Sequence, residues 1–259
     1  SWADSCLGTS SAPGDAGTAL GAALAVATAR GHRFEELRSS QLGPGYTDAA
    51  IADALDRWGV EYRHVSDPAS EAARLLAEDR IVGWFEARSE FGPRALGGRS
   101  LLANPIRPET QDRMNAIKGR EEFRPLAPSI LADAAGEYFD VVVDAPFMSF
   151  TLPVSARGRE ALPAAVHVDG SSRPQLVQRS SGVYARMIEL FHEETGIPAV
   201  LNTSFNVGPF PIVQTPRDAI GCFFTAPIDA LVAGSCVVEK PGVGRTLAQS
   251  GSSLAHLRG

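Results

Sequence analysis

Short apolar runs alternate with amphipathic stretches from residue 68 to residue 238, and this alternation constrains the fold more than any other feature of the sequence. Residues 81–85 and 198–202 are apolar runs of the length expected for buried strands. Between them, residues 182–195 place apolar side chains at helical spacing on one side. Mixed strands and helices in this order predict an α/β fold, an open sheet with flanking helices.

Further elements are expected from the same pattern and from turn residues. Thr215 followed by Pro216 is typical of a helix start, with Thr215 as N-cap. The remaining predicted elements are helices at residues 49–58, 68–79 and 110–118, and strands at residues 60–65, 147–154 and 228–238.

Composition shifts divide the chain into four regions. Residues 1–33 are rich in Ala, Gly and Ser, and we expect a small-residue helix at 18–24 that needs neighbours on several faces. Residues 34–66 form a predicted connector, and residues 67–241 the α/β body. Residues 242–259 are rich in Gly and Ser and are expected to fray.

Charge and hydropathy exclude several classes of function. Hydrophobic residues make up 44% and charged residues 21% of the chain, which excludes a wholly disordered protein. No apolar run approaches the roughly 20 residues of a membrane helix. The net charge of −6 argues against a nucleic-acid coat but leaves room for a local basic pocket. No basic stretch precedes an apolar core near the N-terminus, so we expect a cytoplasmic protein.

The three cysteines, Cys6, Cys222 and Cys236, have no CxxC spacing and no histidines at zinc-ligand spacing. A disulfide framework or a structural zinc site is therefore not expected. We interpret them as small buried hydrophobic residues. Neither a GxxxxGK[ST] loop nor a GxSxG elbow occurs, so the sequence supports neither a Walker loop nor a serine hydrolase.

Four segments of the body carry most of its turn-associated Arg, Lys and Asn: residues 90–100, 115–125, 167–175 and 201–206. In the first segment, glycines let the backbone approach a ligand closely, and Arg94 and Arg99 can each fork onto phosphate oxygens. The alternative is a surface loop with solvated arginines.

The second segment closes a predicted helix with Lys118 and Arg120 and continues to Arg124. Attraction of cations to a helix C-terminus is an alternative explanation for this cluster. Arg124 lies between Phe123 and an apolar Pro-Leu-Ala-Pro run, so we expect it to be partly buried. A buried arginine needs an anion.

The third and fourth segments place polar groups at strand ends. Arg173 and Gln175 fall on one side of an extended stretch, while His167 is more typical of a structural residue than of a general base. The buried strand at 198–202 runs directly into Asn202 and three further polar residues. Ligands bind at such strand ends in α/β folds, although a plain turn is the alternative. Together the four segments predict a basic pocket for phosphates.

Four motifs in order carry a resemblance to a known family: FGPRALG (residues 91–97, with Arg99 and Ser100), FRPLAP (123–128), HVDG (167–170, with Arg173 and Gln175) and LNTSFNV (201–207). Over about residues 1–240, this chain resembles the C-terminal region of the O-carbamoyltransferases, which carbamoylate nodulation factors and antibiotics. The resemblance implies a YrdC/Sua5-like open twisted sheet preceded by the remnant of an actin-like, Kae1-like domain.

The resemblance also implies an activity and its site. This domain would convert carbamoyl phosphate and ATP, with Mg²⁺, into carbamoyl adenylate, and a Kae1-like domain in cis or in trans would pass the carbamoyl group to a hydroxyl of a small-molecule natural product. The implied catalytic residues are Lys118, Arg124 and Arg173, and the implied ligand-binding residues are Arg94, Arg99, Arg120, Asn202 and Ser204.

Two departures from the family pattern bear on this expectation. Asp15, within a Pro-Gly-Asp-Ala-Gly turn, resembles an iron ligand of the Kae1-like domain, but one aspartate cannot hold a metal and no HxxxH pair occurs here. We expect either a fragment or one half of a split enzyme. In addition, residues 207–211 lack the charges of the family's Arg-Gly-Glu-Pro loop.

Two alternative functions remain open from the sequence. One is a non-catalytic nucleotide-binding half of a split enzyme, and the other is a YrdC-type factor in tRNA threonylcarbamoylation, against which the acidic net charge argues. The expected partners are carbamoyl phosphate, a hydroxylated acceptor and a Kae1-like domain, with a homodimer as a further option. Neither nucleic acid nor a membrane is expected as a partner.

Overall fold

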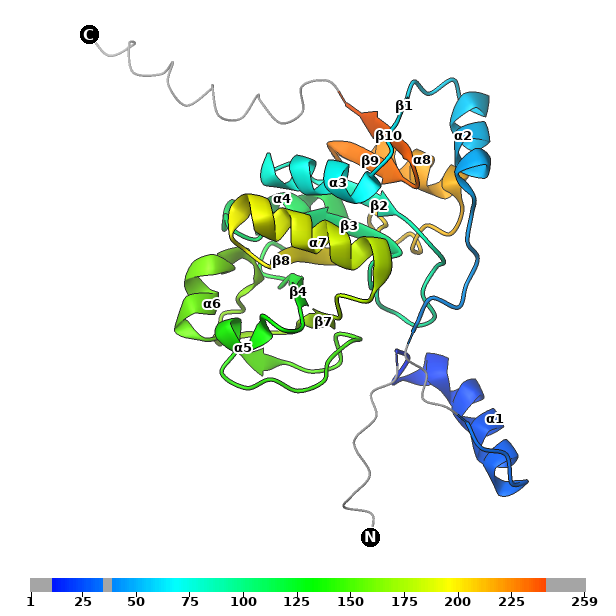
Figure 1. Ribbon diagram of the computed structural model, residues 1–259, viewed down its shortest axis with the longest axis vertical. Helices are drawn as coiled ribbons and strands as arrows, with labels where there is room; N and C mark the ends of the chain where they lie inside the picture. The colour runs from blue at the N-terminus through cyan, green and yellow to red at the C-terminus, as the bar shows by residue number, and fades with distance from the viewer. Residues whose placement is uncertain (1–10, 35–38, 241–259) are drawn as a thin grey trace.

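An eight-stranded mixed sheet forms the centre of the protein, in the order β1-β10-β9-β2-β3-β8-β4-β7. A computed structural model describes residues 11–34 and 39–240 (Figure 1). Its sheet strands are β1 (Arg63–His64), β2 (Val82–Phe85), β3 (Arg99–Ala103), β4 (Ala127–Leu131), β7 (Gln175–Val177), β8 (Ala199–Ser204), β9 (Ala230–Ala233) and β10 (Cys236–Glu239). A separate pair joins β5 (Leu152–Pro153) to β6 (Ser171–Ser172).

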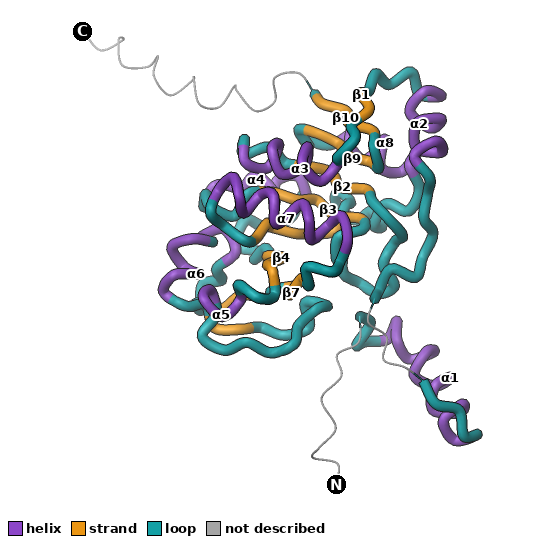
Figure 2. The backbone as a smooth tube through the Cα atoms, viewed as in Figure 1, coloured by secondary structure: helices purple, strands orange, loops and turns teal. Residues whose placement is uncertain are grey.

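Helices flank the sheet, as Figure 2 shows in purple. They are α1 (Thr18–Ala29), α2 (Asp48–Arg57), α3 (Pro68–Ala77), α4 (Glu109–Lys118), α5 (Ala135–Tyr138), α6 (Ala156–Ala161), α7 (Gly182–Thr195) and α8 (Pro216–Thr225), with short 3-10 turns at Asp15–Gly17 and Pro163–Ala165. The predicted α/β class, with an open sheet and flanking helices, is confirmed.

Helices α3 and α7 pack against each other over one face of the sheet. Their side chains form one core with apolar residues of the strands. This core includes the fully buried Trp84 of β2 and Phe191 of α7. A second core on the other face joins α2, α4 and α8 to the sheet and includes Leu101 and Phe205. Successive residues of β3 and β8 therefore point into different cores, as the two-residue period of a strand requires.

The predicted elements appear in the predicted order, with differences among the strands. The single strand predicted at 228–238 is two antiparallel strands, β9 and β10, because a turn at residues 234–235 separates them. Strand β3 was not predicted. It directly follows Gly97 and Gly98, and these turn residues favour a loop in a prediction from hydrophobic periodicity. Of the strand predicted at 147–154, only Leu152–Pro153 pairs with another strand, the two-residue β6, and Val154 adds an isolated bridge to Phe139.

Residues from the predicted connector reach the body at three places, the first being residues 40–45, whose backbone hydrogen-bonds to residues 88–91. Helix α2 contacts α8, and β1 pairs with β10 at the edge of the sheet. Thr47 caps α2 by accepting a hydrogen bond from the backbone N–H of Ala50. Ile51 and Leu55 of α2 are buried against the sheet core, as the predicted amphipathic face requires.

Helix α1 stands apart from the sheet (Figure 1) and has no buried residue. The neighbours that its small apolar side chains need are not supplied by the described residues of this chain. Cys236 is buried, as predicted, whereas Cys222 is only half-buried. Cys6 and the tail at 242–259 lie outside the described residues. Among the described residues, no helix combines the length and apolar character needed to span a membrane.

Candidate functional site

A small cavity of about 120 Å³ opens beside the last residues of β8. Arginines reach it from three places: the loop before β3, the end of α4 and the segment before β7. The cavity is named here the arginine cavity, and its polar lining consists of Arg94, Arg120, Arg173, Asn202, Thr203 and Ser204. The sequence prediction that distant cationic segments converge on one pocket is thus met by these three arginines.

The arginines of this cavity lie close enough to repel one another, and each is half-buried. Burial lowers the pKa of Arg173 most, and the positive charges of Arg94 and Arg120 lower it further. The pKa of Arg120 is likewise lowered, first by burial and then by Arg124. Because a guanidinium stays charged at neutral pH, this mutual repulsion is a free-energy cost that a bound anion would offset.

Two guanidinium nitrogens at the cavity are buried without a hydrogen-bond partner. They are Nε of Arg173 and Nη2 of Arg120, whose Nε donates to Oδ1 of Asn115 over 2.7 Å. Leaving a buried charged donor unpaired costs about 1–3 kcal/mol or more. Phosphate and carboxylate oxygens are the acceptors that match such donors best. The lining of the arginine cavity therefore has donors of the kind that an anion would match.

A buried network of neutral side chains forms the floor of the cavity. The amide nitrogen of Asn202 donates to Ala95 O (3.1 Å), Ser129 Oγ (3.0 Å) and Gln175 Oε1 (3.2 Å). Ser129 in turn donates to Gln175 Oε1 over 2.7 Å. This network ties β8, β4 and β7 to the loop that carries Arg94, so it fixes the position of the loop.

Hydrogen bonds from its own backbone hold the loop before β3 in place. Oε1 of Glu90 accepts hydrogen bonds from the backbone N–H groups of Leu96 (2.7 Å) and Gly98 (2.6 Å). Gly97 has φ +105°, and a Cβ there would lie 2.4 Å from the ring of Tyr184. Only glycine fits this position, because both the backbone angle and the close approach exclude a side chain.

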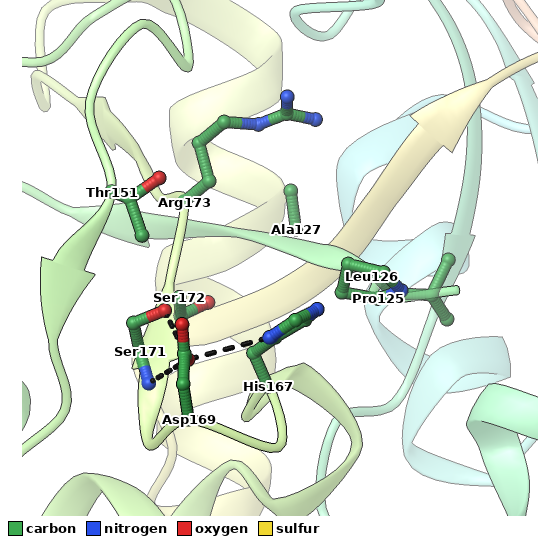
Figure 3. A pocket seen from close by; sticks show the side chains of 9 residues that line it. All are labelled: Pro125, Leu126, Ala127, Thr151, His167, Asp169, Ser171, Ser172 and Arg173. Carbon is green, nitrogen blue, oxygen red and sulfur yellow. Dashed lines mark hydrogen bonds and ion pairs between the residues drawn. The ribbon is translucent and has the colours of Figure 1, made fainter. Parts of the chain in front are cut away.

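A second lobe adjoins the arginine cavity, with Arg173 on the border of both (Figure 3). Its volume is about 230 Å³, and residues 125–127 form the shared wall. His167 and Asp169 lie next to each other in its wall, with 3.3 Å between Nδ1 and Oδ1. Asp169 also accepts hydrogen bonds from the hydroxyl and N–H of Ser171, and these lower its pKa. His167 thus belongs to a hydrogen-bonded turn.

Lys118 lies at the edge of this region but points into the protein. Its ammonium donates to Ser204 O (2.7 Å), Ser204 Oγ (3.0 Å), Asn206 O (2.9 Å) and Asn206 Oδ1. Burial and the charge of Arg120 lower its pKa to about 8. In this structure Lys118 therefore holds the turn after β8 and does not line the arginine cavity.

Two predicted site residues lie elsewhere. The partial burial expected for Arg124 is wrong: its side chain is 55% exposed and pairs with Glu121 over 3.2 Å, because the turn at 121–124 directs it outward. Arg99 is fully buried but points away from the arginine cavity. Its guanidinium donates to Glu86 O (2.7 Å) and Pro44 O (3.1 Å) and stacks on the ring of Phe85. Arg99 is a structural residue that does not line the cavity.

Asp15 does not fit an iron site on the described residues. It is exposed in a 3-10 turn at the start of α1, and its backbone oxygen accepts from Thr18. Across residues 11–34 and 39–240, no group of three His, Cys, Asp or Glu side chains could hold a metal. No carboxylate is among the described residues that line the arginine cavity either, so Mg²⁺ would have to arrive with nucleotide phosphates.

Sequence reasoning missed several residues of the site. Ser129 lies within an apolar strand, and a polar residue in such a run is the signal that could have found it. Glu90 and Tyr184 shape the loop from a distance and gave no local signal. Met148 lines the cavity with φ +53°, a left-handed conformation that is rare for a non-glycine residue.

The structure is thus an α/β domain with a cluster of half-buried arginines beside the end of β8. A family model described as the carbamoyltransferase C-terminus matches residues 73–240, and the chain belongs to this family. The resemblance to the O-carbamoyltransferases is thereby confirmed.

Curated relatives agree with this family. The chain is 43% identical over 236 residues to nodulation protein NolNO of Sinorhizobium fredii, covering 87% of this chain and 35% of the relative. It is 42% identical over 236 residues to nodulation protein NolO of Bradyrhizobium diazoefficiens, covering 87% and 43%. Nodulation protein U of the latter organism is 40% identical, with 77% and 34% covered. The chain thus spans less than half the length of these relatives.

Solved structures with similar folds include Sua5 of P. abyssi complexed with L-threonine, at 16% identity and a TM-score of 0.48, over 64% of this chain and 46% of that one. Full-length HypF in a phosphate- and nucleotide-bound form matches 70% of this chain and 23% of its own, at 18% identity and a TM-score of 0.46.

Proposed function

We propose that this chain is the part of an O-carbamoyltransferase that forms carbamoyl adenylate from carbamoyl phosphate and ATP. The observation that carries the proposal is the arginine cavity, where Arg120 and Arg173 retain buried N–H groups without partners. The reaction brings two polyanions together, and fixed cations stabilise the negative charge that develops on the transferring groups.

The bond changes can be balanced with one water molecule. Water cleaves carbamoyl phosphate at phosphorus, releasing phosphate and carbamate. A carbamate oxygen then attacks the α-phosphorus of ATP, and pyrophosphate leaves with the electron pair of the broken bond. Arg94, Arg120 and Arg173 would hold the phosphate groups in the arginine cavity, and the adjoining lobe offers room for the rest of the nucleotide. A Kae1-like domain, in cis or in trans, would transfer the carbamoyl group to a hydroxyl of a small-molecule natural product.

The test is pyrophosphate release in the presence of ATP, Mg²⁺ and carbamoyl phosphate. We expect release that requires both substrates and falls about 100-fold in Arg173→Gln, because one aligned donor to the developing charge contributes that much. Arg186→Gln is the matched control, since Arg186 is an exposed arginine on α7 paired with Asp67. Pyrophosphate release at the wild-type rate in Arg173→Gln would contradict the proposal, as would no release by the wild type.

A further inference from the structure

The amide of Asn202 has only one orientation that its surroundings allow. The carbonyl oxygen of Ala95 can only accept a hydrogen bond, so it must face Nδ2 of Asn202, which lies 3.1 Å away. Gln175 is fixed by the same logic, because its Nε2 donates to the carbonyl oxygen of Leu96 over 3.0 Å and so turns Oε1 toward Asn202. A flipped Asn202 would place oxygen against oxygen at both contacts.

This fixed orientation leaves Oδ1 of Asn202 as an acceptor without a donor. The side chain lines the arginine cavity, is 2% exposed, and its Oδ1 is buried with no hydrogen-bond partner among the described residues. Buried polar side-chain atoms are rarely left in this state unless a ligand or water completes them. The residues that line the cavity thus combine positive donors with a neutral acceptor that has no donor, Oδ1 of Asn202.

We infer that Oδ1 of Asn202 accepts a hydrogen bond from the amino group of the carbamoyl substrate and selects it over acyl phosphates that lack this group. An anion that carries its own N–H donor fits both features of the cavity. The arginines would donate to its phosphate oxygens, and Oδ1 of Asn202 would accept from its nitrogen. Acetyl phosphate has a methyl group at that position and would leave Oδ1 buried and unpaired. This inference rests on the proposed function, because it assigns the carbamoyl donor to the same cavity.

Ser129 and Gln175 are positioning residues in this scheme. Neither has a free donor toward the cavity: the hydroxyl of Ser129 donates to Gln175, and the amide nitrogen of Gln175 donates to Leu96 O. Their effect is to hold the amide of Asn202 so that its oxygen, and not its nitrogen, faces the ligand. Selectivity for an N–H group then arises from a buried acceptor that the wrong ligand cannot satisfy.

The test compares two stable phosphonates that differ only in this group. Phosphonoacetamide carries an amino group where 2-oxopropylphosphonate carries a methyl group. We expect isothermal titration calorimetry on the full chain to give about tenfold or tighter binding of phosphonoacetamide. In Asn202→Ala the preference for phosphonoacetamide should fall below about threefold. Gln175→Met keeps Asn202 but removes the acceptor that orients its amide, so it should also reduce the preference. A merely structural role would weaken both phosphonates without changing their ratio.

Inorganic phosphate separates this inference from the proposed function. If the wild type binds phosphate and both phosphonates equally well, the arginine cavity holds anions but the role of Asn202 is overturned. If the wild type binds none of the three, both the inference and the proposed function fail. The wild-type comparison needs no variant, so it remains decisive even if Asn202→Ala does not fold.

Discussion

Arg99 and Lys118 are buried cations whose terminal nitrogens donate hydrogen bonds within the protein, although Nε of Arg99 has no partner. Arg99 donates to backbone carbonyls around Glu86 and Pro44, and Lys118 donates to the turn at Ser204 and Asn206. Arg120 and Arg173 also keep buried N–H groups without partners, but unlike Arg99 these two residues line the arginine cavity. The four residues look alike in the sequence. What separates anion ligands from structural cations is which acceptors the fold places around each one, and no local pattern encodes this.

Lys118 gives a pH-dependent prediction at the residue scale. Its pKa is lowered from 10.5 to about 8 in the folded protein, so between these values the unfolded chain binds a proton that the folded chain does not. The free energy of unfolding contributed by Lys118 should therefore rise as pH increases from about 8 to about 10.5. Urea unfolding across this range checks it, with Lys118→Met as the reference that removes the titration. A wild-type stability that falls relative to Lys118→Met would contradict the account.

At the scale of the element, sequence reasoning succeeds where local chemistry decides. The start of α8 was predicted from Thr215 and Pro216, and the structure has a capping box there, in which Thr215 accepts from the N–H of Asp218 and Asp218 accepts from the N–H of Thr215. Strand β3 was not predicted, because it forms by pairing with β2 and β8, and the local sequence after Gly97 and Gly98 does not indicate this tertiary contact. Tertiary context overrides propensity most easily in short strands.

The cap of α8 gives the prediction at this scale. Thr215→Ala removes the side-chain acceptor for the Asp218 N–H, so the free energy of unfolding should fall by about 1 kcal/mol. Thr225→Ala at the other end of the same helix is the control, because the Thr225 hydroxyl only bonds back to carbonyls of its own helix and the change should cost less than about 0.5 kcal/mol. Equal losses in the two variants, measured by urea unfolding, would contradict the role of the cap.

At the scale of the whole molecule, the order of strands and helices was readable from the sequence, while the convergence of its polar segments was only partly so. Three of the five predicted arginines line one cavity. Arg124 points outward and pairs with Glu121, and Arg99 is buried and donates to backbone carbonyl groups. The helix α1 has exposed apolar side chains and contributes nothing to the arginine cavity. The cavity is therefore a property of the sheet, the end of α4 and the neighbouring loops, and the proposed anion binding can be measured on this chain.

The most direct test of the account is the affinity of the chain for inorganic phosphate, measured by isothermal titration calorimetry. Arg94→Gln, Arg120→Gln and Arg173→Gln should each weaken binding by about tenfold or more, since a hydrogen bond from a charged donor contributes about 1.5–3 kcal/mol. Arg186→Gln, at an exposed ion pair on α7, should bind phosphate as the wild type does. Undiminished phosphate binding in all three cavity variants would show that these arginines do not form an anion site.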